Sequence, residues 1–362
     1  MDGEGARLAE EALWKGPLNA ITDVEGVRVG HVTLVRGEGR LVPGRGPVRT
    51  GVTVIVPGEG VYERKFVAGA HVINGFGKAV GLPQLVELGR LETPIGLTNT
   101  LCVWRAAEAL AEAAIRENPG IGVRGPTVNP VVGECNDGYL NDIQGMHVRK
   151  EDVALALERA SAGPVEEGAV GAGTGMVCYG WKGGIGSASR RWRCEALDRE
   201  VTLGALVLAN FGRPQDLVID GFPAGHLLAE VREEEPRAGE GGSVIVVYAT
   251  DAPLTSRQLT RVARRAAAGL ARTGSVYHHG SGDFALAFST ARAYPPYLPD
   301  EGHYLNPFFL AAAETAAEAV WRALAAARAM TGRDGRTVDA LPVERVRELA
   351  ARRGLRLPSL ET

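Results

Sequence analysis

Ser243 stands where a strand expected in the core begins, and a serine in that position can act as a nucleophile. It follows Gly242, and the apolar, β-branched run 244–248 behind it has the pattern of a fully buried strand. A rigid strand would hold the hydroxyl still, and glycine lets the backbone before it adopt conformations closed to other residues. The stretch is either an ordinary loop-to-strand junction or a self-cleavage site.

Self-cleavage at this point has a defined chemistry. Ser243 Oγ would attack the Gly242 carbonyl, an ester would form, and water would free Ser243 as a new N-terminus. The free α-amine, whose pKa is typically about 7.7–8.0, could then act as base for its own hydroxyl, as in N-terminal nucleophiles. The products would be chains 1–242 and 243–362.

Two more polar residues are expected at the same end of the sheet. Ser281 and Asp283 open the strand expected over 284–288, as Ser243 opens its own, and two adjacent strands would bring all three together. Asp283 could then orient Ser281, which could hydrogen-bond the nucleophile or its amine. The alternative is a serine-glycine turn with the aspartate as a cap.

Candidate groups for binding an oxyanion and a substrate come from two other stretches. Asn210 ends the strand expected over 201–209, where a preorganised side-chain amide can donate to an oxyanion. Glu134 could bind a substrate ammonium group, and Asn136 or Tyr139 could donate to the oxyanion. A turn-forming asparagine and an ordinary surface loop are the alternatives.

Nucleotide and metal chemistry lack the residues that they require. The glycine-rich stretch 171–175 is followed by Met176 where a dinucleotide-binding fingerprint needs glycine, and no G-K-[ST] follows. The four cysteines form no C-x-x-C pair and have no histidines at zinc spacing, so buried free thiols are expected. The neighbours His278 and His279 alone do not make a metal site.

The composition is that of a globular protein without a surface for polyanions. A net charge of −3, from 40 basic and 43 acidic residues, gives no sign of nucleic-acid binding. No apolar run reaches the roughly 18 residues of a membrane span. The N-terminus lacks the apolar segment of a secretory signal, so a cytoplasmic location is expected.

Strands and helices alternate in groups, which indicates a layered α+β sandwich. A helix expected over 255–272 separates the strands at 243–249 and 284–288 and would cover one face of their sheet. The stretch 121–145 is expected to be rich in loops. Further strands are expected over 27–35, 51–56 and 66–73, and further helices over 82–91, 102–116, 151–161, 307–330 and 342–353.

Ten short motifs follow one another along the chain: INGFG (73–77), ETPI (92–95), TNT (98–100), DGYLND (137–142), GAGTGM (171–176), KGGIG (182–186), ANFG (209–212), GS (242–243), ATDAP (249–253) and GSGD (280–283). Taken jointly, they resemble the family of L-aminopeptidase D-esterase/D-amidases and β-aminopeptidases. The resemblance covers roughly residues 18–330, in order. No single motif is specific.

The resemblance implies an αββα sandwich like that of N-terminal-nucleophile hydrolases, with different strand connectivity. It implies one catalytic domain, 1–362, that cuts itself into two chains which stay together and assemble into homo-oligomers. No metal or organic cofactor would be needed. By position, Ser243 is the nucleophile, Asn210 the oxyanion donor, and Ser281 with Asp283 the supporting pair.

Two positions depart from the family members studied as β-aminopeptidases. Those members carry glutamate where this chain has Asp283, whose side chain is one methylene shorter. They also tend to have glutamate after the N-G-x-G motif, where this chain has Lys78. A reversed charge near a substrate pocket would change the substrate preference.

Three functions are therefore weighed. The first is an autoprocessed serine aminopeptidase or amidase that releases N-terminal residues from small peptides, amides or esters. The second is a self-cleaving acyltransferase of the ornithine acetyltransferase type, although that family carries threonine where this chain has Ser243. The third is an uncleaved binding or structural protein.

Overall fold

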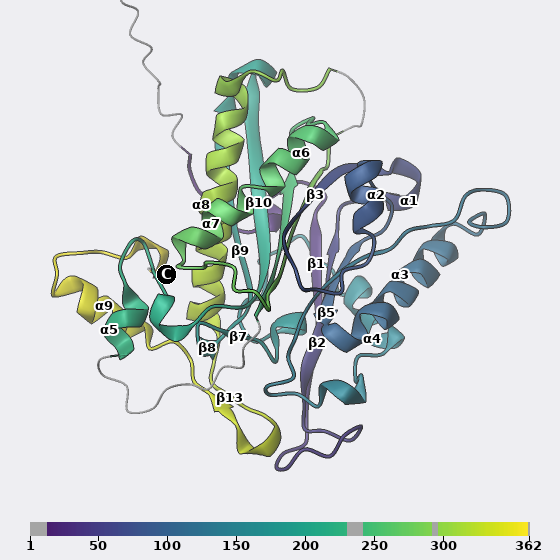
Figure 1. Cartoon of the computed structure of the whole chain (residues 1–362). Helices are drawn as coiled ribbons and strands as arrows, with labels where there is room; N and C mark the ends of the chain where they lie inside the picture. The colour runs from purple at the N-terminus through teal and green to yellow at the C-terminus, as the bar shows by residue number, and fades with distance from the viewer. Residues whose placement is uncertain (1–12, 230–241, 292–295, 361–362) are drawn as a thin grey trace, which may run out of the picture.

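The computed structural model describes residues 13–229, 242–291 and 296–360. These residues form four layers, in which two stacked β-sheets lie between two layers of helices (Figure 1). The layered α+β architecture expected from the sequence is therefore confirmed. No helix of the described part is long and apolar enough to cross a membrane.

The larger sheet has six strands and carries the residues singled out above. Its central strands, β11 and β12, run parallel, and every other neighbouring pair in it is antiparallel. In spatial order the strands are β4 (Arg90–Leu91), β3 (Phe66–Gly75), β12 (Gly282–Ser289), β11 (Ser243–Thr250), β10 (Arg199–Asn210) and β9 (Gly184–Cys194).

The smaller sheet has four strands and packs against the larger one. Its strands β5 and β6 run parallel, and the other pairs are antiparallel. In spatial order they are β1 (Arg28–Arg36), β2 (Val48–Val56), β5 (Ile95–Asn99) and β6 (Val131–Cys135). Two hairpins lie outside the sheets: β7 (Val177–Cys178) with β8 (Trp181–Lys182), and β13 (Met330–Thr331) with β14 (Thr337–Val338).

Helices cover the outer face of each sheet. The four-stranded sheet is covered by α3 (Val103–Glu117) and α4 (Lys150–Glu158). The six-stranded sheet is covered by α6 (Ser256–Ala263) and α8 (Gly302–Ala326), with α8 lying along β9 and β10 (Figure 1). In the same layer, α7 (Ala266–Arg272) packs against α8. The remaining α-helices of the described part are α1 (Val61–Arg64), α2 (Leu82–Glu87), α5 (Ala224–Ala229) and α9 (Val343–Ala351).

The unbroken apolar run of β11 is explained by burial on both of its faces. Val244, Val246 and Tyr248 belong to the core under the helices, whereas Ile245 and Val247 belong to the core between the two sheets. Alternate residues of a strand point to opposite faces, so a strand buried on both needs apolar residues throughout. The buried strand expected after Ser243 is confirmed.

Several element boundaries differ from the sequence-based expectation. The helix expected over 255–272 is two helices, since Arg264 and Arg265 form a turn between α6 and α7. The helix expected from Pro307 already begins at Gly302, because the N–H groups of Tyr304 and Leu305 bond to the Glu301 carbonyl and close an earlier turn.

Strands β5, β6 and β9 were not expected, because glycines interrupt their apolar runs. The tertiary structure explains one of these glycines. A side chain at Gly186 of β9 would collide with the Ala319 carbonyl of α8, so the close approach of helix and sheet requires glycine there. The helix expected over 82–91 ends at Glu87, because residues 90–91 pair with β3 as strand β4.

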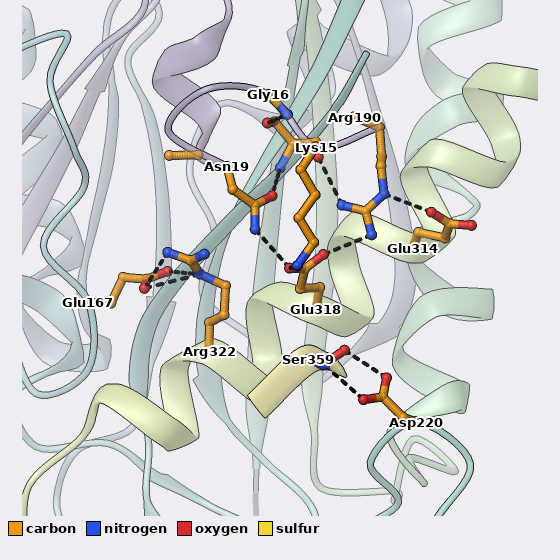
Figure 2. A network of polar contacts seen from close by, with 12 residues as sticks. Lys15, Gly16, Asn19, Glu167, Arg190, Asp220, Glu314, Glu318, Arg322 and Ser359 are labelled. Atoms are coloured by element: carbon orange, nitrogen blue, oxygen red, sulfur yellow. Dashed lines mark hydrogen bonds and ion pairs between the residues drawn. The ribbon is translucent and has the colours of Figure 1, made fainter. Parts of the chain in front are cut away.

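A buried carboxylate joins the N-terminal segment to α8 and β9. Glu318 of α8 accepts hydrogen bonds or ion pairs from Lys15 at 2.8 Å, Arg190 at 2.8 Å and Asn19 at 2.7 Å (Figure 2). Its side chain is only 4% exposed. Burial alone would raise the pKa of Glu318, but the charge of Arg190 and the hydrogen bonds from Lys15 and Asn19 hold it below its ordinary value.

Candidate active site

Strand register brings the polar strand ends together at one end of the six-stranded sheet. Asn210 pairs with Ser243 in antiparallel register, and Ser243 pairs with Gly282 in parallel register. On the other side of β12, Gly282 lies opposite Gly75. Asn210, Ser243 and the Ser281–Asp283 segment are therefore neighbours, although up to 73 residues separate them in sequence.

The Gly242–Ser243 peptide lies beside the N–H group of Gly282. That N–H donates to the Gly242 carbonyl oxygen at 3.2 Å and lies 3.4 Å from Ser243 Oγ. Ser243 is 5% exposed, and the Cys135 thiol donates to its carbonyl oxygen at 3.3 Å. One backbone donor thus faces both the hydroxyl and the carbonyl that the hydroxyl would attack.

Glycine before Ser243 is required by close packing in this structure. A Cβ atom at Gly242 would lie 2.7 Å from Cα of Phe211 and 3.0 Å from the Asn210 carbonyl oxygen. The first of these is closer than real Cβ contacts allow. The peptide bond before the serine is therefore pressed against the end of β10.

Ser281 and Asp283 form a buried hydrogen-bonded pair. The Ser281 hydroxyl donates to Asp283 Oδ1 at 2.6 Å, and the two residues are 3% and 1% exposed. Burial raises the pKa of Asp283 to about 6, although hydrogen bonds from Ser281 and the Val244 backbone act in the opposite direction. Among the described residues, Asp283 Oδ2 has no hydrogen-bond partner.

The Asn210 side chain is held at both ends of its amide. Its Oδ1 accepts from the Val177 N–H at 2.8 Å, and its Nδ2 donates to the Asn136 carbonyl oxygen at 3.1 Å. Because an N–H can only donate, the bond from Val177 assigns the oxygen end of the amide. The NH₂ group of Asn210 is therefore the end that can donate toward a substrate.

Glu134 lies at the end of β6 with its carboxylate buried. Oε1 accepts from the Lys78 backbone N–H at 2.9 Å, and Oε2 accepts a short hydrogen bond from the Thr100 hydroxyl. The residue is 1% exposed. Next to it, Cys135 contacts the Ser243 carbonyl, so β6 carries this carboxylate toward the end of β11.

Asn136 and Tyr139 have different positions relative to this cluster. The Asn136 carbonyl bonds Asn210, while its exposed side chain accepts from the Gly138 N–H at 2.9 Å. The guanidinium group of Arg336 lies over the Tyr139 ring, with its Cζ atom 5.0 Å from the ring centroid. In the described part of the chain, no hydrogen bond joins Tyr139 to Ser243 or Asn210.

No group of three or more metal-ligating side chains occurs in the described ranges. His278 acts through its backbone, since its carbonyl accepts from the Ser281 N–H at 2.9 Å and from Asn74 Nδ2 at 2.8 Å. The four cysteines, which all lie in the described ranges, are buried and form no disulfide bond. The stretch 171–173 is a short 3₁₀ turn packed against β2, not a loop that opens a long helix.

Comparison with known proteins identifies the family. Residues 19–338 match peptidase family S58. The chain belongs to peptidase family S58. Two similar proteins are named as β-peptidyl aminopeptidase BapA. The one from Sphingosinicella microcystinivorans is 39% identical, with 92% of this chain and 88% of the relative covered. The one from Sphingosinicella xenopeptidilytica is 39% identical, with 90% of this chain and 85% of the relative covered.

Solved structures extend the S58 assignment to the fold. The PH0078 protein of Pyrococcus horikoshii OT3 matches with TM-score 0.88 and 51% identity over 95% of this chain and 96% of that one. A Burkholderia sp. β-aminopeptidase matches with TM-score 0.85 and 40% identity over 95% and 97%. The L-aminopeptidase D-Ala-esterase/amidase of Ochrobactrum anthropi matches with TM-score 0.85 and 39% identity over 95% and 96%.

The Ochrobactrum enzyme is described as a prototype of the serine aminopeptidases and a new variant of the Ntn hydrolase fold. The family recognised from the motifs, the fold class and the serine aminopeptidase class are therefore confirmed for this S58 chain. The sequence did not point to the backbone donors of Gly282 and Val177, because no residue type marks a backbone N–H.

Proposed function

We propose that this S58 serine aminopeptidase matures by cutting its own Gly242–Ser243 bond and then uses the freed Ser243 as its nucleophile. The observation that carries the proposal is the Gly282 N–H, which lies 3.2 Å from the Gly242 carbonyl oxygen and 3.4 Å from Ser243 Oγ. A donor in that place stabilises negative charge on the carbonyl oxygen as the hydroxyl adds.

The self-cleavage consumes one water molecule. Ser243 Oγ adds to the Gly242 carbonyl carbon while Gly282 N–H donates to its oxygen. The tetrahedral intermediate collapses by breaking the C–N bond, and the proton from Oγ passes to the departing amine. Water then hydrolyses the ester, which leaves a carboxylate on Gly242 and a free α-amine and hydroxyl on Ser243.

Turnover by the mature enzyme repeats this chemistry on a substrate. The Ser243 α-amine takes the hydroxyl proton, Oγ attacks the scissile carbonyl, and the amine returns the proton to the leaving group. The Asn210 NH₂ group donates to the oxyanion, with Asn136 or Tyr139 as further candidates, and Glu134 binds the substrate ammonium. The Ser281–Asp283 pair, joined at 2.6 Å, supports the serine.

The two mature chains, 1–242 and 243–362, would remain one catalytic unit. β11 and β12 belong to the smaller chain and are inserted between β10 and β3 of the larger one. Separation would break backbone hydrogen bonds along two strand pairs and expose the core between the sheets. Assembly of these units into homo-oligomers is part of the proposal.

The substrates are small peptides, amides or esters with a free N-terminal amine. Relatives are named as β-peptidyl aminopeptidases and as an L-aminopeptidase D-Ala-esterase/amidase. The shorter Asp283 and the cationic Lys78 distinguish this chain from the β-aminopeptidase pattern. The preference among L-, D- and β-residues is therefore a property to measure by screening aminoacyl p-nitroanilides on the processed protein.

Intact-mass measurement of the purified protein tests self-cleavage. We expect two chains, and N-terminal sequencing of the smaller one should read Ser-Val-Ile-Val. Ser243→Ala should remain one chain and release no p-nitroaniline. A correctly folded wild-type protein that stays full-length would overturn self-cleavage, and acetyl transfer to ornithine without amide hydrolysis would favour the acyltransferase instead.

A further inference from the structure

The structure contains a lysine that the proposed mechanism does not use and that lies in its interior. Lys182 is the second residue of β8 and is fully buried, with a relative exposure of 0%. Burying an ammonium group is costly unless hydrogen bonds replace its water. The ammonium group of Lys182 has three donors, and all three find backbone carbonyls.

Those carbonyls belong to the glycine-rich segment and its hairpin. Lys182 Nζ donates to the carbonyl oxygens of Met176 at 2.6 Å, Gly183 at 2.8 Å and Gly173 at 3.0 Å. The chain from 173 to 183 is thus wrapped around one charged group. The bond to Met176 is the shortest of the three and has a consequence at Asn210.

The carbonyl of Met176 and the N–H of Val177 belong to the same planar peptide group and point in opposite directions. The carbonyl end accepts from Lys182, and the N–H end donates to Asn210 Oδ1 at 2.8 Å. A line of amide hydrogen bonds therefore runs from the ammonium through one peptide to the side chain of Asn210. Hydrogen bonds in series polarise one another, so a charge at one end strengthens donation at the other.

We propose that Lys182 is a positioning residue for catalysis, whose ammonium acts through the Met176–Val177 peptide to orient and polarise the Asn210 amide as oxyanion donor. The inference rests on the role that the proposed function gives to Asn210. Orientation follows because a fixed Val177 N–H forces Oδ1 toward β7 and leaves Nδ2 to donate. Polarisation follows because positive charge on Lys182 draws electrons along the amide series, making the Nδ2 hydrogens better donors to an anion.

The electrostatic surroundings make this device sensitive to pH. Burial lowers the pKa of Lys182 to about 7, and the nearby Asp137 carboxylate acts in the opposite direction. Burial raises the pKa of Asp137 to about 7 and of Cys178 to about 12, so the thiol stays neutral near pH 7. Asp339 contacts Lys182 through its carbonyl, which accepts from the Lys182 backbone N–H at 2.8 Å.

Kinetics of Lys182→Met provide the first test, since methionine keeps the length of the side chain without its charge. The variant should self-cleave, because Gly282 and not Asn210 contacts the Gly242 carbonyl. On protein shown by intact mass to be two chains, we expect kcat to fall on the order of 10-fold with KM unchanged. Complete loss of an oxyanion donor costs about 10²–10³ in kcat. Thr174→Val, which removes a hydrogen bond to the Gly171 carbonyl in the same segment, should leave kcat within twofold.

A double variant separates this inference from the proposed function. If Lys182 acts through Asn210, then Lys182→Met should cause no further loss in an Asn210→Ala background. A wild-type kcat for Lys182→Met, or an additional 10-fold loss of kcat in the double variant, overturns the proposed role of Lys182 and leaves the proposed role of Asn210 standing. A wild-type kcat for Asn210→Ala instead overturns the proposed oxyanion donor, and with it any catalytic role of Lys182 through that residue.

A spectroscopic measurement tests the same link without relying on activity. With ¹⁵N-asparagine labelling, the Asn210 NH₂ resonances can be assigned by their absence in Asn210→Ala. The titration is recorded in a Ser243→Ala background, which stays one chain and has no Ser243 α-amine to titrate beside Asn210. There the resonances should move upfield as pH rises through about 7, when Lys182 loses its charge, and adding Lys182→Met should remove the inflection. Resonances that stay constant from pH 5.5 to 8.5 in this background, or an inflection that persists with Lys182→Met, would overturn the proposal.

Discussion

Ser243 lies directly opposite Asn210 in the antiparallel register of β11 and β10. The proposed nucleophile and the proposed amide donor therefore lie on adjacent strands at the same end of the sheet, and the ladder of backbone hydrogen bonds sets their separation. This separation is set by two buried core strands, and not by loops. Catalytic groups need rigid supporting elements, so this register supports the roles proposed for Ser243 and Asn210.

Gly282→Ala should slow self-cleavage by at least 10-fold. A Cβ atom there would lie 2.8 Å from Gly77 Cα and from the Phe76 carbonyl oxygen, so the 75–78 loop or the start of β12 must shift. Such a shift would move the N–H that bonds the Gly242 carbonyl. Time courses of chain cleavage after expression, followed by intact mass, measure the effect.

The matched control for that variant is Gly120→Ala, whose added methyl group meets no atom within 4 Å. It should cleave at the wild-type rate. Equal cleavage rates in Gly282→Ala and Gly120→Ala would show that the Gly282 N–H is dispensable.

Asp283→Asn should change stability in a pH-dependent way. The folded-state pKa of about 6 lies above the ordinary 3.8. A carboxyl with a raised pKa contributes stability below its unfolded pKa, and that stability is lost as pH rises through the folded pKa. The wild type should therefore lose stability between about pH 4 and 6, whereas the asparagine variant should not.

Thermal unfolding of both proteins in a Ser243→Ala background, where each is expected to be one chain, measures the difference. Asp283→Asn should have the higher Tm at pH 8 relative to wild type, and the gap should narrow toward pH 4. In the enzyme that keeps Ser243, Asp283→Asn should lower kcat, because Ser281 loses its anionic partner. A Tm gap that is constant from pH 4 to 8 would contradict the assigned ionisation.

Glu134→Gln should weaken binding of substrates with a free amine. If the carboxylate binds the substrate ammonium, its loss should raise KM for an aminoacyl p-nitroanilide about 10-fold or more, a charged hydrogen bond being worth about 1.5–3 kcal/mol. The matching des-amino acyl p-nitroanilide serves as the internal control, because it has no ammonium to bind. An equal change in KM for both substrates would assign Glu134 to structure and not to amine recognition.

Glu318→Gln should destabilise the fold without changing the chemistry. Loss of one partner of a buried ion pair typically costs about 3 kcal/mol, and we expect no more than that here, because Arg190 keeps its ion pair with Glu314 at 2.7 Å. Because the folded pKa of Glu318 is depressed, its contribution is present above the unfolded pKa and is lost as pH falls through the folded pKa. The Tm difference from wild type should be clear at pH 7 and shrink below about pH 4, near the unfolded pKa.

Glu348→Gln is the control for that variant. It removes an exposed i,i+3 ion pair with Arg345 at 3.1 Å, which should cost less than about 1 kcal/mol. If both variants lose the same stability, the contacts of Glu318 drawn in Figure 2 do not stabilise the packing of the N-terminal segment against α8.

Local patterns in the sequence predicted most of the elements that carry the site. The strand after Ser243 is predicted because residues 244–248 are all apolar and mostly β-branched, so both faces of the strand carry apolar side chains. Strands β5, β6 and β9 were missed because their sequences are short or rich in glycine. At Gly186 the glycine is required by contact with α8, and a contact between residues 133 positions apart leaves no local signal.

The sequence by itself singled out the serine, carboxylate and amide side chains proposed for catalysis, and through its ordered motifs it determined the family. Only the tertiary structure decided that the Gly282 N–H faces the Gly242 carbonyl and that Lys182 is linked through Val177 to Asn210. The physical reason is that backbone donors are identical in every residue except proline. Their positions follow from strand register and helix packing between segments far apart in the chain, which residue types alone do not encode.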